Sequence, residues 1–583
     1  MALPGNPIVW SPHTAADTLD ASSSRPGTMS ALQNLIPDPT TRDLWQCRPA
    51  AIPLTNLNSH AFSSGFSSGF GGIFAGQAGF ISALLNIGTR IYGMVATQLN
   101  PGHDQPFCYD VVTQQFIPIT GITAANTPVS PPTVGPWAPP SMALVGGKII
   151  VAHPGFTQGN GFFGVINVTN PFALTWTSQN TTGTPLIFPP TWVANFNGRC
   201  FFLVNPPTVQ PAAYMSDSLN ATSITNANQI LTFGDNTPIT VAAGLALNNQ
   251  LGGIIQALMV FKGVSNIFQV TGDYALGNLA VNSLNVATGT MSPNSVVSSE
   301  KGLVFVAPDG VRLIDFTAVI SDPIGKDGDG ITVPFIFSQT PSRVSGMFNS
   351  GIYRVQIQNS IVPGAPQQEW WYDFVRDLWS GPHTTKVSLG VPYQNTFIIT
   401  RQGSNGILYQ SDQVQSNTST FVEDGAPMSF IWGTAMLPDT DQMSECAMVE
   451  STIYMQLATG LNVTVSAVTP DGTVLDSVNV TGHGTPTLWG QFVWGQGIWY
   501  GSQVDAGGSN ALYPRRLAWH APLVFRRVAI VMLGSCVPGL KIGRTHLKYQ
   551  VLGYLQEDLD PSLSGGGLFT LDHSALGGPD VLG

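Results

Sequence analysis

The chain has 583 residues, which is enough to bury a large hydrophobic core and to form two or three domains. Only 9% of the residues are charged and the net charge is −11, which disfavours nucleic-acid binding through phosphates because that needs clustered Lys and Arg. Gly (63) and Pro (44) are abundant and disfavour helices, so the composition predicts an all-β protein of short strands and tight turns.

The five cysteines are far apart and include no C-x-x-C pair. We expect buried free thiols and neither a disulfide framework nor a zinc site, which fits folding in a reducing cytoplasm. The first residues lack the basic and apolar regions of a signal peptide, so no secretion signal is expected. The cysteines are Cys47, Cys108, Cys200, Cys446 and Cys536.

Residues 1–45 are rich in Pro, Ser and Thr and keep no hydrophobic period, which predicts an extended N-terminal arm that lies over a neighbouring subunit. Further on, residues 71–88 are largely apolar and imitate a membrane span. Their glycines, together with Gln77 and Asn86, favour a buried β-rich segment instead. No membrane-spanning segment is therefore expected.

Residues 46–425 contain a loose repeat of apolar strand, Gly- or Asn-containing turn and second apolar strand. The turn Asn197-Gly198 between two apolar runs is a strong hairpin signal. Similar hairpins centre near residues 90, 147, 198, 263, 308, 350 and 403, with a mean spacing of about 50 residues, which is typical of four-stranded propeller blades. Tyr214-Met-Ser-Asp217 and Tyr409-Gln-Ser-Asp412 end two of the units in the same way. We expect a β-propeller of six or seven blades.

A turn-rich run at residues 421–427 ends the repeat. Alternating strands follow, with a hairpin turn at Asp471-Gly472, and they predict a β-sandwich platform domain over residues 426–556. Residues 557–583 are rich in Gly, Ser and Asp and are expected to form an extended C-terminal tail. The aromatic run 488–500 is expected either to anchor a subunit interface or to fill the sandwich core.

Two glycine motifs resemble catalytic or cofactor-binding loops. Gly65-Phe-Ser67-Ser-Gly69 fits the G-x-S-x-G nucleophile elbow, but it has no strand before it and no helix after it. Gly159-Asn-Gly161-Phe-Phe-Gly164 fits G-x-G-x-x-G, but a β-branched strand follows in place of the helix that would bind a pyrophosphate. We therefore expect a low-complexity segment and a hairpin loop.

Two polar motifs resemble a catalytic motif and a calcium-binding loop. Ser298-Ser-Glu-Lys301 fits S-x-x-K without its partner motifs, so a solvent-exposed turn is expected. Asp327-Gly-Asp329-Gly330 resembles half of a calcium loop but lacks the distal Glu. A hydrated turn is favoured, and a calcium ion near Asp327 and Asp329 is the alternative. We predict no catalytic, cofactor-binding or metal-binding residue, and no enzyme.

Three stretches resemble the tail nozzle proteins of short-tailed bacteriophages, also called tail tubular protein B. They are residues 257–315, the tryptophan-rich run 369–383 and the closing strands within 522–554, which together cover most of residues 250–555. The resemblance implies a propeller subunit of a hexameric tube that binds the head-to-tail adaptor and the tail fibres or needle. DNA would pass through the lumen without sequence-specific binding. The protein would be assembled in the bacterial cytoplasm and reside in the virion tail.

Two other functions stay open. One is a virion receptor-binding or fibre-attachment protein, which would bind a bacterial glycan. The other is a propeller enzyme that degrades polysaccharide, which would need acidic residues from several blades converging on one cavity. Uncharged polar surfaces favour the nozzle, because subunits can then pack without the desolvation cost of buried ions.

Overall fold

The computed structural model describes most of the chain, in segments separated by gaps. The described residues are 6–10, 14–15, 28–29, 31–41, 43–56, 78–97, 102–130, 139–248, 254–284, 286–324, 326–327, 330–331, 344–358, 367–401, 406–413, 420–423, 425–438, 444–457, 461–482 and 513–554. Within them almost all regular structure is strand. The four helices are short 3-10 turns, and none of the helices found is long and apolar enough to cross a bilayer. These turns are η2 (Ala124–Asn126), η3 (Ala227–Gln229), η4 (Tyr274–Leu276) and η5 (Pro293–Ser295).

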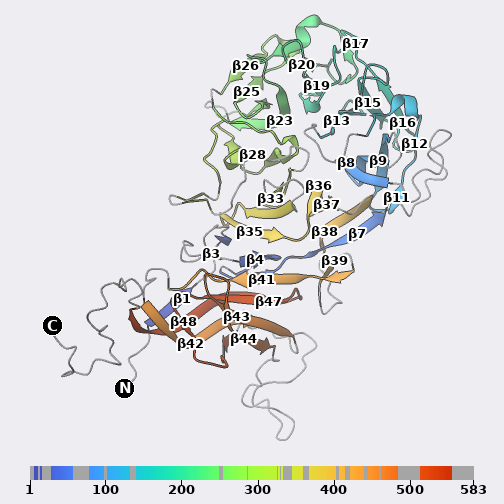
Figure 1. Cartoon of the computed structure of the whole chain (residues 1–583). Coiled ribbons are helices and arrows are strands. Elements are labelled where there is room, and N and C mark those ends of the chain that lie inside the picture. Colours follow the sequence, from blue (N-terminus) through green and yellow to red (C-terminus); the bar gives the residue numbers. More distant parts are fainter. Residues whose placement is uncertain are drawn as a thin grey trace, which may run out of the picture.

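Seven sheets, or blades, follow one another along the chain and form a ring (Figure 1). The first strand of each blade contacts the first strand of the next, and the first strand of blade 7 contacts that of blade 1. The structure is therefore a closed seven-bladed β-propeller, which confirms the predicted all-β propeller and fixes the blade count. Hydrophobic clusters fill the spaces between neighbouring blades.

The first four blades have four or five strands each. Blade 1 consists of β8 (Ala78–Ile87), β9 (Arg90–Thr97), β10 (Asp104–Asp110) and β11 (Gln115–Phe116). Blade 2 consists of β13 (Ser141–Val145), β14 (Lys148–Ala152), β15 (Phe163–Asn167) and β16 (Leu174–Gln179), with β12 (Ile119–Thr120) beside β16. Blade 3 consists of β18 (Trp192–Phe196), β19 (Arg199–Val204), β20 (Ala212–Met215) and β22 (Ile230–Thr232). Blade 4 consists of β23 (Ile239–Asn248), β24 (Ile254–Lys262), β25 (Asn266–Thr271) and β26 (Ala280–Ser283).

The last three blades complete the ring. Blade 5 consists of β27 (Val297–Ser299), β28 (Gly302–Ala307) and β29 (Gly310–Asp315). Blade 6 consists of β32 (Ser345–Asn349), β33 (Ile352–Gln358), β34 (Gln367–Asp373) and β35 (Leu378–His383). Blade 7 consists of β36 (Val387–Tyr393), β37 (Thr396–Arg401), β38 (Ile407–Gln413) and β7 (Ala50–Asn56).

Blade 7 takes its outermost strand from the N-terminal part of the chain. Strand β7 pairs antiparallel with β38, which is more than 350 residues away, as in the partners Ile407 and Asn56. The ring is thus closed by backbone hydrogen bonds between distant segments, and it cannot open without losing that pairing.

Two further sheets face each other in a β-sandwich beside blade 6 (Figure 1). One sheet has the order β45 (Tyr513–Arg516), β42 (Ser444–Gln456), β48 (Lys541–Tyr554), β6 (Trp45–Cys47) and β5 (Leu35–Pro37), with β1 (Asn6–Trp10) on β48 and β46 (Val524–Phe525) on β42. The other has the order β4 (Ala31–Gln33), β41 (Ser429–Gly433), β47 (Ala529–Ser535), β43 (Asn462–Val468) and β44 (Val474–Thr481). One hydrophobic cluster fills the sandwich and continues into blades 5 and 6.

The N-terminal segment differs from the extended arm that its composition suggested. Strands β1, β4, β5 and β6 pair with sandwich strands of the same chain. Apolar residues such as Leu35 and Trp45 are buried there, which offsets the entropy lost on ordering this Pro- and Ser-rich segment. Four short pairings complete the fold: β2 (Thr14–Ala15) with β3 (Thr28–Met29), β17 (Thr182–Gly183) with β21 (Ser223–Ile224), β30 (Lys326–Asp327) with β31 (Gly330–Ile331), and β39 (Val422–Glu423) with β40 (Ala426–Pro427).

Several sequence-based expectations can be compared with this fold. All five cysteines are buried and free, as predicted. The Asn197-Gly198 and Asp471-Gly472 turns join β18 to β19 and β43 to β44, as predicted. The Ser67 motif, the aromatic run 488–500 and the tail 557–583 lie outside the described residues.

Gly164 on β15 gives a direct test of blade packing. A Cβ at this position would lie 1.9 Å from Cη2 of the buried Trp176 on β16. We expect Gly164→Ala to lower the free energy of unfolding by about 1 to 3 kcal/mol, because the ring must move within a packed core. Denaturant unfolding measures this. Gly244→Ala on β23 is the matched control, since no atom lies within 4 Å of its Cβ position. Equal losses in the two variants would contradict the packing described here.

Candidate functional site

A cavity of about 170 Å³ lies on the propeller axis, where the first strands of the blades converge. Its walls come from six of the seven blades and combine apolar and small polar groups. They are Ala83, Leu84, Pro140, Ser141, Met142, Trp192, Asn294, Ser345, Gly346, Leu389 and Gly390. These walls include no ionisable side chain, so the cavity offers hydrogen bonds, an indole surface and apolar contact.

Acidic residues stand at the ends of several third strands, but each one binds its own turn. The carboxylate of Asp110 accepts a hydrogen bond from the backbone N–H of Val112 at 3.0 Å. The same contact, from the second residue after the Asp, recurs at Asp273 (2.8 Å), Asp315 (2.8 Å) and Asp373 (2.8 Å). These carboxylates stabilise turns at the rim of the propeller and do not line the axial cavity.

The hydrogen bonds within these turns also shift the pKa of the carboxyl groups. Burial by itself would raise the pKa of Asp315, but hydrogen bonds from Thr317 and Val319 outweigh it and hold the pKa below its ordinary value. The Tyr-x-Ser-Asp echo of the sequence, which ends in Asp217 and Asp412, is a different feature: Asp217 accepts from Thr225 and Gln229, and Asp412 accepts from Arg354 and Ser411. A carboxylate or amide two residues before a turn in successive units was the available signal, but chance Asp and Asn residues obscure it.

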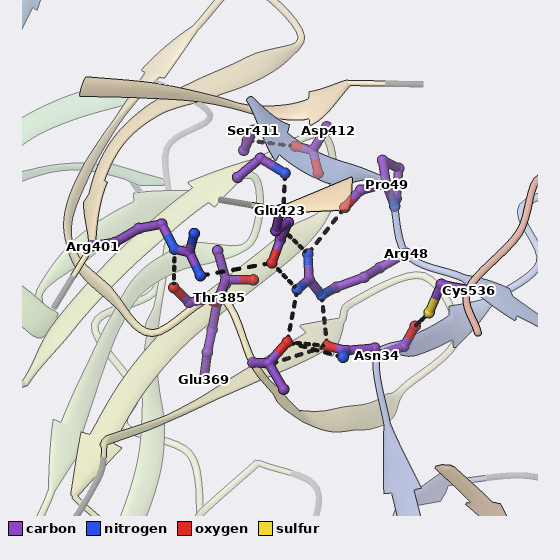
Figure 2. A network of polar contacts seen from close by, with 12 residues as sticks. Asn34, Arg48, Pro49, Glu369, Thr385, Arg401, Ser411, Asp412, Glu423 and Cys536 are labelled. Atoms are coloured by element: carbon purple, nitrogen blue, oxygen red, sulfur yellow. Dashed lines mark hydrogen bonds and ion pairs between the residues drawn. The ribbon is translucent and has the colours of Figure 1, made fainter. Parts of the chain in front are cut away.

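The most extensive buried polar cluster joins the propeller to the sandwich. The chain passes from β6 into β7 through Arg48, and it returns from β38 to β41 through Glu423. The Arg48 guanidinium donates two hydrogen bonds to the Glu423 carboxylate, at 2.7 and 2.8 Å (Figure 2). The two crossing segments are therefore bound to each other by a bidentate ion pair, which we call the crossing clasp.

Further polar contacts hold the clasp in place. The Asn34 side chain accepts from Arg48 Nε at 2.9 Å (Figure 2). It also donates to the backbone oxygen of Ser429 at 2.8 Å. Asn34 also binds Thr384 in the loop between blades 6 and 7. The backbone N–H of Ala51 donates to Glu423 at 2.9 Å. The clasp thus contacts both domains and both crossings.

Because the ion pair is buried, the loss of either partner would strongly destabilise the fold. The side chains of Arg48 and Glu423 are only 1% and 6% exposed. Burial would raise the pKa of Glu423, but the charge and hydrogen bonds of Arg48 outweigh it and hold the pKa below its ordinary value. Loss of either partner leaves an uncompensated charge in the interior, which costs far more than loss of an exposed pair.

A second polar cluster lies between blades 6 and 7. The Arg354 guanidinium stacks on the Trp371 ring at 3.6 Å and donates to Asp412 at 2.5 Å. Next to it Glu369 and His383 are cross-strand neighbours, and Ser380 Oγ lies 3.4 Å from His383 Nε2. Burial raises the pKa of Glu369 and lowers that of His383.

Ser380, His383 and Glu369 are residue types found in hydrolytic triads. Their exposed fractions are 2%, 3% and 1%, because the neighbouring blade covers them. Glu369 accepts a hydrogen bond from Trp371 Nε1 at 2.6 Å. This enclosure leaves no approach for a polymeric substrate, so the cluster serves blade packing.

The sequence motifs that resemble cofactor-binding, catalytic or calcium-binding loops lie apart from one another. Gly159–Gly164 is in the loop from β14 to β15 and in β15 itself, as expected for a hairpin. Ser298 and Ser299 belong to strand β27 and not to the expected turn, which comprises only Glu300 and Lys301. Lys301 Nζ donates to the backbone oxygen of Phe374. Asp327 belongs to strand β30, while Asp329 lies outside the described residues.

Comparisons with known proteins add the following findings. No protein-family model matches the sequence, and no curated protein is significantly similar to it. A glycoside hydrolase family 43 arabinoxylan arabinofuranohydrolase from Bacillus subtilis is similar at 11% identity over 86% of this chain and 99% of that chain, with a TM-score of 0.23. Trypanosoma rangeli sialidase matches at 8% identity over 85% and 95%, with a TM-score of 0.28. Saccharomyces cerevisiae Sqt1 matches at 9% identity over 62% and 100%, with a TM-score of 0.33.

The prediction that the chain is not an enzyme is contradicted by these matches, since the matched structures include a glycoside hydrolase and a sialidase. That prediction relied on missing sequence motifs, and propeller enzymes assemble their sites from residues on separate blades. At these identities and TM-scores the likeness transfers no activity, substrate or residue to this chain.

The crossing clasp predicts how the free energy of unfolding depends on pH. We expect Glu423→Gln to lower the free energy of unfolding at neutral pH by about 3 to 5 kcal/mol, because Arg48 stays buried without a counter-ion. The folded-state pKa of Glu423 lies below its ordinary value of 4.5, so the native contribution is present above about pH 4.5 and is lost as the pH falls through the folded-state pKa. The variant should therefore lose less stability than the native chain on acidification below pH 4.5.

Glu450→Gln is the matched control, since Glu450 is exposed and lies 3.9 Å from Arg516. It should change stability by less than about 1 kcal/mol. Urea unfolding between pH 3 and pH 7 measures both effects. Similar losses for Glu423→Gln and Glu450→Gln would show that the clasp does not join the domains.

Proposed function

We propose that the chain is a structural subunit of the tail nozzle of a short-tailed bacteriophage. In this proposal it forms a ring or tube, as a hexamer, below the head-to-tail adaptor, retains the genome and conducts DNA during ejection. Tail fibres or a tail needle are its distal partners. It acts in the virion tail after assembly in the host bacterial cytoplasm.

The observation that carries the proposal is the way the N-terminal 56 residues tie the two domains together. Strands β4, β5 and β6 belong to the sandwich, and the next strand, β7, closes the propeller. The crossing clasp then binds the entry and exit segments to each other. A subunit that resists internal pressure needs domains that do not separate, and this arrangement supplies that property.

The sequence resemblance supports the proposal from a second side. Residues 257–315 form β24 to β29 of blades 4 and 5, and residues 369–383 lie in β34 and β35 of blade 6. The closing stretches within 522–554 supply β46, β47 and β48 of the sandwich. The three stretches therefore lie in both domains of one framework. Only 9% of the residues are charged, which suits a lumen through which DNA must slide.

Electron microscopy of the purified protein, alone and mixed with adaptor–portal complex, tests the proposal. We expect six-fold rings, or a tube that caps the adaptor. Particles that remain single at all concentrations and never join the adaptor would overturn it.

A second candidate function is carbohydrate recognition, as a receptor-binding protein or as a polysaccharide-degrading propeller. The observation that favours it is the axial cavity, where the Trp192 indole lies among the polar groups of Ser141, Asn294 and Ser345. Aromatic faces combined with hydroxyl and amide groups are suited to sugar rings.

Screening bacterial surface oligosaccharides for binding and for release of reducing ends tests this candidate. If the cavity binds sugar, Trp192→Ala should weaken binding at least about tenfold, because Trp192 is the aromatic side chain of the cavity wall. Trp519→Ala on the sandwich is the control and should bind normally. No binding by the native chain, or equal binding by both variants, would remove the cavity from consideration.

A further inference from the structure

Two of the five buried cysteines lie against each other in the sandwich. Cys47 ends strand β6 and Cys536 directly follows strand β47, so the two residues come from distant parts of the sequence. Both belong to the hydrophobic cluster that fills the sandwich, and their exposed fractions are 6% and 0%. A hydrogen bond links the two thiols.

Further hydrogen bonds hold the two sulfur atoms at this place. The Cys536 thiol donates to the backbone oxygen of Asn34 at 4.0 Å (Figure 2). Asn34 directly precedes Leu35, which pairs with Cys47 between β5 and β6. The backbone N–H of Val537 donates to the Cys47 sulfur. The segment after β47 and the strand β6 thus bring their sulfur atoms to one point of the core.

The backbone on both sides of this contact is also fixed. The N–H of Cys536 donates to Met428 O at 2.7 Å, and its carbonyl oxygen accepts from Phe421 N–H at 2.8 Å. Strand β6 pairs with β5 on one side and with β48 on the other. Because both backbones are held, the two thiols stay in reach of each other without a search through other conformations.

The other cysteines have different surroundings. Cys108 is on β10 of blade 1, where the Tyr92 hydroxyl is its hydrogen-bond partner. Cys200 is on β19 of blade 3, inside the hydrophobic cluster between blades 2 and 3. Cys446 is on β42 of the sandwich, and Val551 is its partner on β48. Cys200 is therefore a buried thiol in the propeller that can serve as a control.

We propose that Cys47 and Cys536 are a site of reversible oxidation, at which a disulfide bond joins the two sheets of the sandwich. Cys47 belongs to the sheet of β48, β6 and β5, whereas Cys536 follows β47 of the other sheet. The bond would lie next to the crossing clasp, since Arg48 directly follows Cys47. The inference goes beyond the proposed function and does not depend on it, because both thiols belong to one chain.

A peroxide is the class of oxidant that suits the site, because it is small enough to reach a buried thiol. Hydrogen peroxide converts the first thiol into a sulfenic acid: the oxygen–oxygen bond breaks, a sulfur–oxygen bond forms, and the thiol proton leaves with hydroxide as water. The second thiol then attacks that sulfur, so the sulfur–oxygen bond breaks, the disulfide forms and a second water leaves. Cys47 reacts first, since it is the more exposed of the two.

The buried position makes this reaction slow. Burial raises the pKa of the Cys47 thiol well above its ordinary value, and the neighbouring Cys536 thiol raises it further. Little thiolate is then present at neutral pH, and the thiolate is the reactive form. The pair would therefore stay reduced in a reducing compartment and become oxidised gradually in an oxidising medium.

The disulfide is compatible with the hydrogen bonds around it. Oxidation removes the Cys536 S–H donor, but Asn34 O still accepts from the backbone N–H of Arg48 at 3.0 Å. The Val537 N–H keeps the Cys47 sulfur as an acceptor, because that atom remains in place as part of the disulfide. These buried backbone groups thus stay paired in both redox states.

Counting thiols in the native chain tests the site. The chain is purified under reducing conditions, exposed to hydrogen peroxide, denatured and alkylated with N-ethylmaleimide before mass spectrometry. We expect the number of alkylated cysteines to fall from five to three, and a non-reducing peptide map to contain one linked pair with Cys47 and Cys536. Dithiothreitol should restore all five.

Two variants separate the pair from a general sensitivity to oxidation. Cys200→Ala removes a buried thiol outside the pair and should still form the linked peptides. Cys47→Ala should form no linked peptides. In thermal unfolding, oxidation should raise the midpoint of the native chain and of Cys200→Ala by roughly 4 °C, because the bond restricts the unfolded chain. It should leave the midpoint of Cys47→Ala unchanged.

The native chain alone decides the outcome if a variant fails to fold. Five alkylated cysteines, after an exposure that oxidises the urea-unfolded chain, would overturn the proposal. A link that involves Cys446 in place of Cys47 or Cys536 would overturn it as well, and so would oxidation of Cys47 to the sulfinic acid without a link.

Discussion

The buried ion pair between Arg48 and Glu423 is the interaction on which the arrangement of the two domains depends. Each residue lies on one of the two segments that cross between propeller and sandwich, and both side chains are almost fully excluded from water. Two such charges are stable in the interior only as a pair with further hydrogen bonds, which Asn34 and Ala51 provide. The geometry that satisfies the pair therefore also fixes how the crossings lie.

The polar groups of the propeller must also find hydrogen-bond partners, and they do so through contacts that recur from blade to blade. Its polar groups at the rim are satisfied locally, by aspartates that bind their own turns and by basic side chains that reach the next blade, as Arg90 and Lys301 do. These contacts hold neighbouring blades to each other at their rims.

A joined framework and a low charge content suit the proposed role of a ring subunit through which DNA passes. The axial cavity of the propeller is separate from these features and allows the alternative of sugar recognition. The two functions make opposite demands, since a ring subunit needs a partner at its outer face whereas a sugar-binding protein needs access to its axis.

The sequence by itself determined the strand class, the buried thiols and the repeat. Gly and Pro content, Asn197-Gly198 and hairpin spacing are local signals, and they predicted a propeller correctly. Hairpin position within a blade was not predicted, because those near 263, 308 and 403 join second and third strands whereas the others join first and second. Only the tertiary structure placed the N-terminal strands in the sandwich and in blade 7, and brought Arg48 to Glu423 across 375 residues. Such contacts depend on burial and pairing between distant segments, and no local pattern in a single sequence encodes them.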